Sequence, residues 1–123
     1  MTQSALESAF ALAWRLYAPD APEPVAEYRF APPRRFRLDF AWVPQRVGVE
    51  LQGGTFTQGR HTRGTGYERD CEKHNLLQSA GWRCYYVTAG MLDRDPAGVV
   101  AMVREAIAEK IPSSGDTVGV RTK

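Results

Sequence analysis

The chain has 123 residues, of which 43% are hydrophobic, and this fits one domain with a modest core. Lys and Arg number 16 against 14 Asp and Glu, so the net charge of +2 does not by itself indicate a nucleic-acid partner. No apolar run reaches the roughly 18 residues of a membrane span, and residues 1–4 form no basic signal-peptide region, so we expect a cytoplasmic protein.

The first half of the chain predicts a helix and then three strands. The helix covers residues 3–18, where apolar residues recur at helical spacing: Leu6, Phe10, Ala13 and Tyr17. Prolines then end it, because proline lacks the N–H that a helix interior needs. The strands are predicted over residues 27–30, 35–42 and 47–52, with a bend at Pro32-Pro33.

The second half of the chain predicts a helix, a strand and a helix. Residues 53–66 are rich in glycine and predict a functional loop, since structureless loops of about 12–15 residues are uncommon in compact domains. A helix follows and ends near Ala80. A largely buried strand is predicted over residues 82–88, and a last helix over residues 97–110.

This order of elements predicts an α/β fold, with a mixed four-stranded sheet flanked by helices. We interpret residues 1–111 as a single domain and residues 112–123 as a flexible tail. In a cytoplasmic protein the thiols of Cys71 and Cys84 stay reduced, and we expect both to be small core residues.

Two carboxylates, Asp39 and Glu50, meet in the predicted hairpin of the second and third strands. Alternation puts these two residues and Gln52 on one face and the apolar residues on the other. The apolar residues are Phe36, Leu38, Phe40, Trp42, Val47, Val49 and Leu51. Pairing Trp42 with Val47 keeps the apolar faces together. It also sets Asp39 opposite Glu50, with Cβ atoms about 4.5–5.5 Å apart.

Two acids at that distance repel unless something positive lies between them, and two interpretations stay open. The first is a divalent ion such as Mg²⁺, which proteins hold with one or two carboxylates and water. The second is neutralisation by arginines, which gather in the same part of the chain. A basic stretch around an acidic site also indicates a polyanionic partner. The arginines are Arg34, Arg35, Arg37, Arg46, Arg60, Arg63 and Arg69.

Asp39, ten further residues and then Glu50-Leu51-Gln52 resemble the signature of the PD-(D/E)XK phosphodiesterase superfamily. The predicted order of elements is similar to the restriction-endonuclease-like core of that family. The chain departs from the signature at two positions, with Leu38 in place of proline and Gln52 in place of lysine. The resemblance implies an endonuclease that hydrolyses DNA phosphodiesters with Mg²⁺ or Mn²⁺ and needs no small-molecule cofactor.

Within that superfamily, the small size and the basic loop are most similar to Holliday junction resolvases of the phage or archaeal type. The resemblance implies a homodimer that makes paired nicks in a four-way DNA junction, in the host cytoplasm if a phage encodes it. Residues 59–64 are also similar to a loop of very-short-patch-repair nicking nucleases, so a mismatch nuclease is an alternative. A DNA-binding module without catalysis and a structural subunit of a phage or plasmid complex are further alternatives.

The resemblance also assigns roles to residues near the two acids. Asp39, Glu50 and the backbone carbonyl of Leu51 would bind the metal ion. Gln52 would hold the nucleophilic water by hydrogen bonds, but it cannot supply the positive charge of a lysine. Resolvases carry an acidic residue in the first helix, and Glu7 is the residue at that position, where a solvated helix residue is the alternative.

Lys73 is our candidate for the missing positive charge. It lies about one helical turn before Leu76 and Leu77, which are expected to face the sheet, so its side chain should start toward the sheet. A lysine that lies on the surface is the alternative. His74 is interpreted as structural.

The predicted DNA contacts are Arg34, Arg35, Arg37, Arg60, His61, Arg63 and Arg69. Contacts to phosphates position DNA without reading its sequence, as a structure-specific nuclease requires. For Arg37 the alternative is a local salt bridge, and His61 is alternatively a general base.

Overall fold

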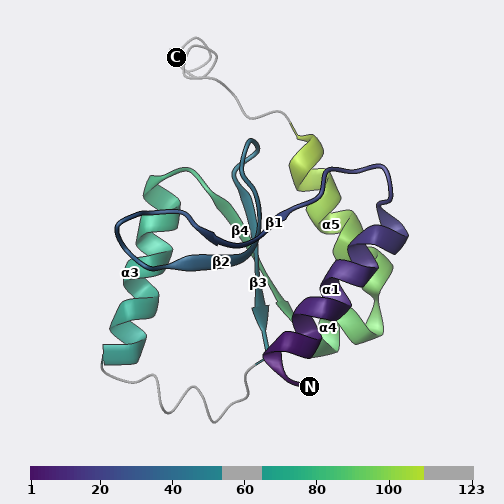
Figure 1. The fold of residues 1–123 in the computed structure, drawn as a ribbon, viewed down its shortest axis with the longest axis horizontal. Coiled ribbons are helices and arrows are strands. Elements are labelled where there is room, and N and C mark those ends of the chain that lie inside the picture. The colour runs from purple at the N-terminus through teal and green to yellow at the C-terminus, as the bar shows by residue number, and fades with distance from the viewer. Residues whose placement is uncertain (54–64, 110–123) are drawn as a thin grey trace, which may run out of the picture.

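The computed structural model describes residues 1–53 and 65–109, which form an α/β fold around one mixed sheet (Figure 1). The elements in chain order are α1 (Gln3–Tyr17), β1 (Val25–Arg29), β2 (Arg37–Trp42), β3 (Val47–Gln52), α3 (Thr65–Ser79), β4 (Arg83–Thr88), α4 (Ala89–Arg94) and α5 (Pro96–Ala108). The strand order is β1-β2-β3-β4, antiparallel except for the parallel pair of β3 and β4. The predicted four-stranded mixed sheet flanked by helices is confirmed. None of the described helices has the length and apolar character of a membrane span.

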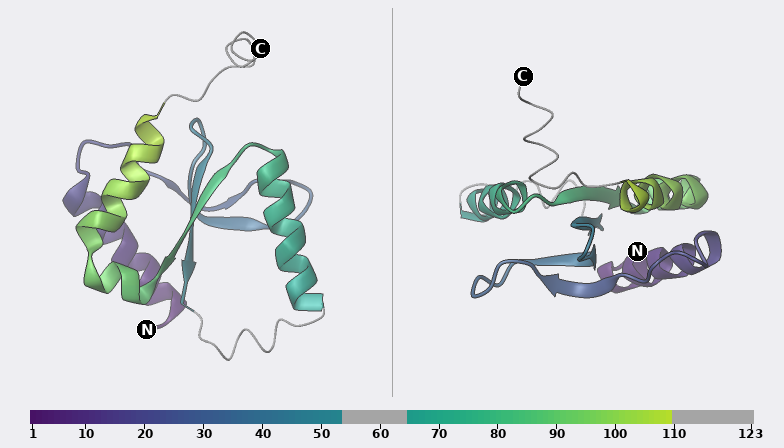
Figure 2. Two further views of the ribbon diagram at one scale, coloured as in Figure 1. Left: turned by 180° about the vertical axis from the view of Figure 1, so that it is seen from behind. Right: turned by 90° about the horizontal axis from the view of Figure 1, so that it is seen from above.

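Helix α1 covers one face of the sheet together with α4 and α5, and α3 covers the other face (Figure 1). Seen from above, α1 lies on one level with β1 and β2, and α5 lies on the other level with β4 and α3 (Figure 2). Helix α1 begins after Thr2, whose Oγ1 accepts a 3.0 Å hydrogen bond from the N–H of Ala5. This cap fixes the start of the helix near the end of β3, where the candidate site lies.

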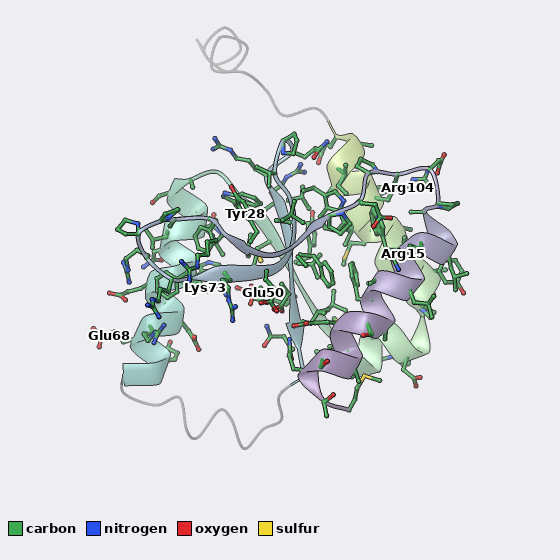
Figure 3. All side chains as sticks on the ribbon, viewed as in Figure 1. Arg15, Tyr28, Glu50, Glu68, Lys73 and Arg104 are labelled. Atoms are coloured by element: carbon green, nitrogen blue, oxygen red, sulfur yellow. The ribbon has the colours of Figure 1, made fainter. Side chains whose placement is uncertain are left out.

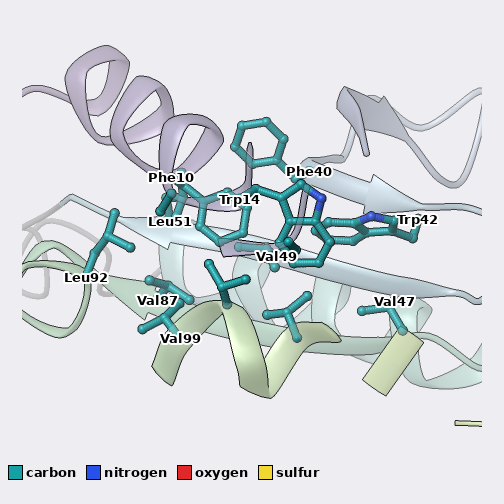
Figure 4. Close-up of a cluster of buried hydrophobic side chains, with 14 of the residues drawn as sticks. Phe10, Trp14, Phe40, Trp42, Val47, Val49, Leu51, Val87, Leu92 and Val99 are labelled. Atoms are coloured by element: carbon teal, nitrogen blue, oxygen red, sulfur yellow. The ribbon is translucent and has the colours of Figure 1, made fainter. Parts of the chain in front are cut away.

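The core on the α1 face is built around aromatic side chains (Figure 4). The rings of Trp14 and Trp42 lie 4.7 Å apart, and those of Phe10 and Phe40 lie 5.1 Å apart. Both indole N–H groups donate to the carbonyl oxygen of Pro22, at 3.0 and 2.8 Å, because a buried indole N–H needs an acceptor. The proline-rich connector is therefore tied to helix and sheet together.

The predicted helix over residues 3–18 is confirmed, but one member of its predicted apolar face is wrong. Tyr17 is 47% exposed, whereas Trp14 is 1% exposed. The connector carbonyl that binds Trp14 draws that side chain into the core, and Tyr17 lies at the end of the helix, past this contact.

The core on the α3 face is smaller and consists of Leu38, Ala41, Leu77 and Trp82. Helix α3 ends as predicted, with Gly81 at a φ of 78° and the N–H of Trp82 donating to the carbonyl of Leu77 at 2.9 Å. On β3, Gly48 leaves room for Leu38, since a Cβ at Gly48 would lie 2.8 Å from Leu38 Cδ1.

The predicted alternation along β2 is wrong around Asp39. Leu38 packs into the core on the α3 face, whereas Phe40 and Trp42 pack into the core on the α1 face. The change of face coincides with an irregular backbone in β1, where Glu27 has a φ of 51° and lies, by the strand register, opposite Asp39. Strict alternation requires regular backbone, so the sequence pattern could not reveal this change.

The last part of the chain differs from the prediction in two ways. The predicted final helix is preceded by a separate short helix, α4, which Thr88 caps before Asp95 caps α5. Strand β4 is an edge strand in which only Val87 is buried, so the predicted burial of this strand is wrong. Edge position leaves one side of the strand without a neighbour and keeps its polar residues in contact with solvent.

The two cysteines are free thiols in different surroundings. Cys84 of β4 is half-buried and packs against the core on the α3 face, whereas Cys71 of α3 is exposed. The prediction of a core residue is therefore wrong for Cys71, which lies on the outer side of its helix.

Candidate functional site

Asp39 and Glu50 lie where β2 and β3 separate. The predicted register is confirmed from Trp42 with Val47 to Phe40 with Val49, which is the last ladder pair before the two acids. Beyond it, Asp39 Oδ2 accepts a 2.7 Å hydrogen bond from the backbone N–H of Leu51. The Asp39 side chain thus takes the place of the backbone acceptor that the next ladder pair would supply to Leu51. Asp39 and Glu50 are neighbours where the two strands separate.

Lys73 of α3 also lies at this point, beside Glu50 (Figure 3). Its Nζ donates to Glu50 Oε2 at 2.9 Å, and the side chains of Lys73 and Glu50 are 22% and 14% exposed. The prediction that Lys73 starts toward the sheet is confirmed. Helix α3 is held in this orientation by Leu77, one turn further on, which is buried against the sheet.

The electrostatics of the pair are set mainly by burial. Burial raises the pKa of Glu50 above its ordinary value, because a low-polarity environment disfavours the charged carboxylate. The positive charge and hydrogen bond of Lys73 oppose this shift, the negative charge of Asp39 adds to it, and the backbone N–H of Asp39 opposes it weakly. A second cation, in addition to Lys73, would therefore further stabilise the charged form of Glu50.

Gln3, at the first turn of α1, also contacts the site, and nothing in the sequence pattern pointed to it. Its Nε2 lies 3.2 Å from the carbonyl oxygen of Leu51 and 3.4 Å from Asp39 Oδ2. Glu7, the residue predicted from the first helix, lies one turn further along and is not among the residues that line the cavity at this point. Helix α1 thus contributes the amide of Gln3 to the site, rather than the predicted carboxylate of Glu7.

These side chains line a polar cavity of about 450 Å³. Its lining residues are Gln3, Asp39, Glu50, Leu51, Gln52, Asp70, Lys73, His74 and Tyr86. Five of the six residues predicted to form the metal and water site are brought together here, and the sixth, Glu7, is not. A second hollow of about 400 Å³ shares Asp39, Glu50, Asp70 and Lys73 and is bordered by arginines. The acid pair therefore lies between a polar cavity and a basic one.

Asp70, His74 and Tyr86 line the cavity but were not predicted as site residues. His74 is exposed and borders the cavity, and its interpretation as structural stays a prediction. Helical spacing could have found two of them, since Asp70 lies three residues before Lys73 and four before His74, and both spacings put side chains on one side of α3. Tyr86 needs the register of β4, which pairs it with Glu50.

Three of the seven predicted DNA contacts lie at the second hollow. Arg35, Arg37 and Arg69 border it. Arg37 also forms a 2.8 Å salt bridge with Glu27, so its alternative role as a local partner is confirmed. Arg34 forms a 3.1 Å salt bridge with Glu72. Predicted contacts Arg60, His61 and Arg63 lie outside the described residues.

Two of these arginines flank one aromatic ring. The guanidinium carbons of Arg34 and Arg69 lie 4.6 and 5.7 Å from the ring centre of Phe36, within the range of a cation–π interaction. Phe36 is 8% exposed, so the ring serves as a support for the two charges. The charges are held near the second hollow, on the same side as α3.

The donor atoms fit a hard divalent cation better than zinc. Asp39, Glu50 and the carbonyl of Leu51 offer oxygens only, and each carboxylate keeps a second oxygen beyond the one that binds Leu51 N–H or Lys73. Mg²⁺ is held in this way, by one or two carboxylates with water completing the shell. Within residues 1–53 and 65–109, no group of three or more His, Cys, Asp and Glu residues that could hold a metal ion is found.

Comparisons of the chain with protein-family models, with curated proteins and with solved structures found no match.

Proposed function

We propose that this protein is a metal-dependent endodeoxyribonuclease with a restriction-endonuclease-like core of the PD-(D/E)XK type. The observation that carries the proposal is the contact of Lys73 with Glu50 at 2.9 Å, beside Asp39 and at the opening between β2 and β3. A cation from α3 there compensates for Gln52, which stands where the signature has lysine. The order of helix, three strands, helix and strand also supports the proposed core.

In this proposal Asp39, Glu50 and the carbonyl of Leu51 hold Mg²⁺, with Mn²⁺ as a substitute. The bound ion would polarise the scissile phosphate and supply hydroxide from a coordinated water. Lys73 keeps Glu50 oriented and adds positive charge beside the phosphate. Gln52 is exposed at the end of β3 and holds the attacking water by hydrogen bonds.

The proposed substrate is branched DNA, with a four-way junction as the first candidate. Arg35, Arg37 and Arg69 around the second hollow would bind phosphates on the approach to Asp39 and Glu50. These contacts are to the backbone, so they suit an enzyme that reads the shape of DNA. The mismatch-nicking alternative uses the same site and differs only in the DNA structure it recognises.

Paired nicks require two sites, so the proposal includes a homodimer. Exposed apolar side chains on α1 support it, because Leu12 and Leu16 are 57% and 64% exposed and lie one turn apart on the same side of the helix. We expect Leu16→Arg to convert a dimer into a monomer in light scattering coupled to gel filtration. A wild-type monomer at micromolar concentration would contradict this part of the proposal.

The central experiment incubates the protein with a four-way junction, a linear duplex and a mismatched duplex in Mg²⁺ and in Mn²⁺. Paired nicks in the junction alone would support the resolvase, and mismatch-dependent nicks would select the alternative. Glu50→Gln is the matched control, since it keeps the shape of the side chain and should bind DNA without cleaving it. If the wild type binds DNA tightly but cleaves it in neither ion, the proposal of an enzyme is wrong. The alternative of a DNA-binding module without catalysis would then hold, and the replacement of the signature lysine by Gln52 favours that alternative.

A further inference from the structure

We propose that Gln3 is an ion-responsive ligand of this site. Its amide NH₂ holds Asp39 and the Leu51 carbonyl together in the ion-free protein, and its Oε1 turns toward the ion when a divalent cation binds. The inference rests on the metal site proposed above and adds a ligand from α1 that differs in chemistry from the acidic residue expected there.

The position of the amide is the first reason. Gln3 Nε2 lies 3.2 Å from Leu51 O, a proposed ligand atom, and 3.4 Å from Oδ2 of Asp39, whose carboxylate is also a proposed ligand. Two ligand oxygens at a right angle on an ion with bonds of about 2.0–2.1 Å lie about 3 Å apart. The two contacts of the amide nitrogen, at 3.2 and 3.4 Å, differ from that separation by only a few tenths of an ångström.

The chemistry of the amide is the second reason. An NH₂ group donates only, so it can bridge two acceptors but cannot bind a cation. The other end of the amide is a carbonyl, and Gln carbonyls are ligands for hard divalent ions. A half-turn of the terminal torsion exchanges the two ends, and that torsion is broad and roughly two-fold. The side chain thus needs no backbone movement to change from donor to ligand.

Gly53, the residue after β3, is the third reason. A Cβ at this residue would lie 2.8 Å from Gln3 Oε1, so the absence of a side chain at Gly53 leaves the space that the amide occupies. The φ of Gly53 lies outside the left-handed region, so alanine fits the backbone there. Gly53→Ala therefore displaces the Gln3 amide without removing any proposed ligand.

The first test measures Mn²⁺ and Mg²⁺ binding by calorimetry without DNA. We expect Gln3→Met, which keeps the length but cannot bind an ion, to weaken binding about tenfold or more, and Gln3→Glu to strengthen it. Gly53→Ala should weaken binding in the same direction as Gln3→Met. Gln78→Met, at an exposed glutamine of α3, is the matched control and should bind as the wild type does.

The second test follows the side-chain NH₂ signals in nitrogen–proton spectra during an Mn²⁺-free Mg²⁺ titration. The Gln3 pair should shift with the binding curve, whereas the Gln78 pair should not. Equal affinity of Gln3→Met and wild type, or a Gln3 signal that does not respond, would overturn the role of Gln3 alone. A wild type that binds neither ion would overturn the metal site and this inference together.

Discussion

The carboxylate of Asp39 accepts a 2.7 Å hydrogen bond from the backbone N–H of Leu51, at the point where the ladder between β2 and β3 ends. The same residue therefore completes the sheet and forms part of the proposed metal site. Substitutions at Asp39 can be chosen to separate the two roles, because an amide side chain accepts a hydrogen bond but binds a divalent ion more weakly than a carboxylate does.

We expect Asp39→Asn to retain the stability of the wild type and Asp39→Ala to lose about 1–3 kcal/mol of unfolding free energy, since it leaves the Leu51 N–H without its partner. Both variants should be inactive on DNA in Mg²⁺. Urea denaturation and a nicking assay measure the two effects. Equal stability of the two variants would show that the hydrogen bond adds nothing to the fold, and full activity of either would sink the proposed metal ligand.

Glu50 should make stability depend on pH in a defined direction. Its pKa is raised in the folded protein by burial, so folded Glu50 keeps its proton to a higher pH than the unfolded chain does. Its contribution is then fully present at low pH and is lost as the pH rises through the folded pKa. Glu50→Gln should therefore gain stability relative to the wild type as the pH rises from about 4 to 8, measured by denaturation across that range. A difference that does not change with pH would contradict the raised pKa.

Lys73 should control both the rate of cleavage and the protonation of Glu50. We expect Lys73→Met to lower the cleavage rate about 10²-fold, because a positive charge beside the phosphate is lost. Its loss also removes the main influence that opposes the raised pKa of Glu50, so the acid limb of the pH–rate profile should shift to higher pH. Lys73→Arg is the matched control and should retain more activity. An unchanged cleavage rate in Lys73→Met would mean that Gln52 and the metal ion are sufficient for cleavage without the lysine.

Leu38 and Gly48 should behave as a size-matched pair. A Cβ at Gly48 would lie 2.8 Å from Leu38 Cδ1, so Gly48→Ala overpacks this contact and should cost about 1–3 kcal/mol. Leu38→Ala should cost about 2–5 kcal/mol because it leaves a cavity in place of a fully buried side chain. The double variant should cost less than the sum of the two, as a denaturation cycle would measure. Strict additivity would mean that the two side chains do not constrain each other.

The parts of the fold that were predicted correctly depend on local signals. The bounds of β3 match the predicted strand over residues 47–52, because alternation there is regular and the chain turns immediately before it. Helix α3 ends at the predicted glycine, whose positive φ few other residues adopt. Helix α4 was missed because its six residues are too few to show a helical period.

The parts of the site that were missed depend on contacts between distant segments. Gln3 contacts Asp39 only because α1 starts beside the end of β3. No motif or spacing in the sequence distinguishes Gln3 from other polar residues. The change of face at Leu38 depends on the backbone of Glu27 in a different strand. Lys73 was found because a buried leucine one turn away fixed the orientation of its helix, which is information the sequence carries locally.

The contrast between the two thiols gives the protein a built-in labelling position. Burial raises the pKa of Cys84 to about 12, so at neutral pH it remains a thiol and reacts slowly with alkylating reagents, which require the thiolate. Cys71 is exposed and lies two residues before Lys73, a spacing that puts the two side chains on different sides of α3. A fluorophore attached to Cys71 would therefore report binding of the proposed DNA substrate beside α3, from a side of the helix other than that of Lys73.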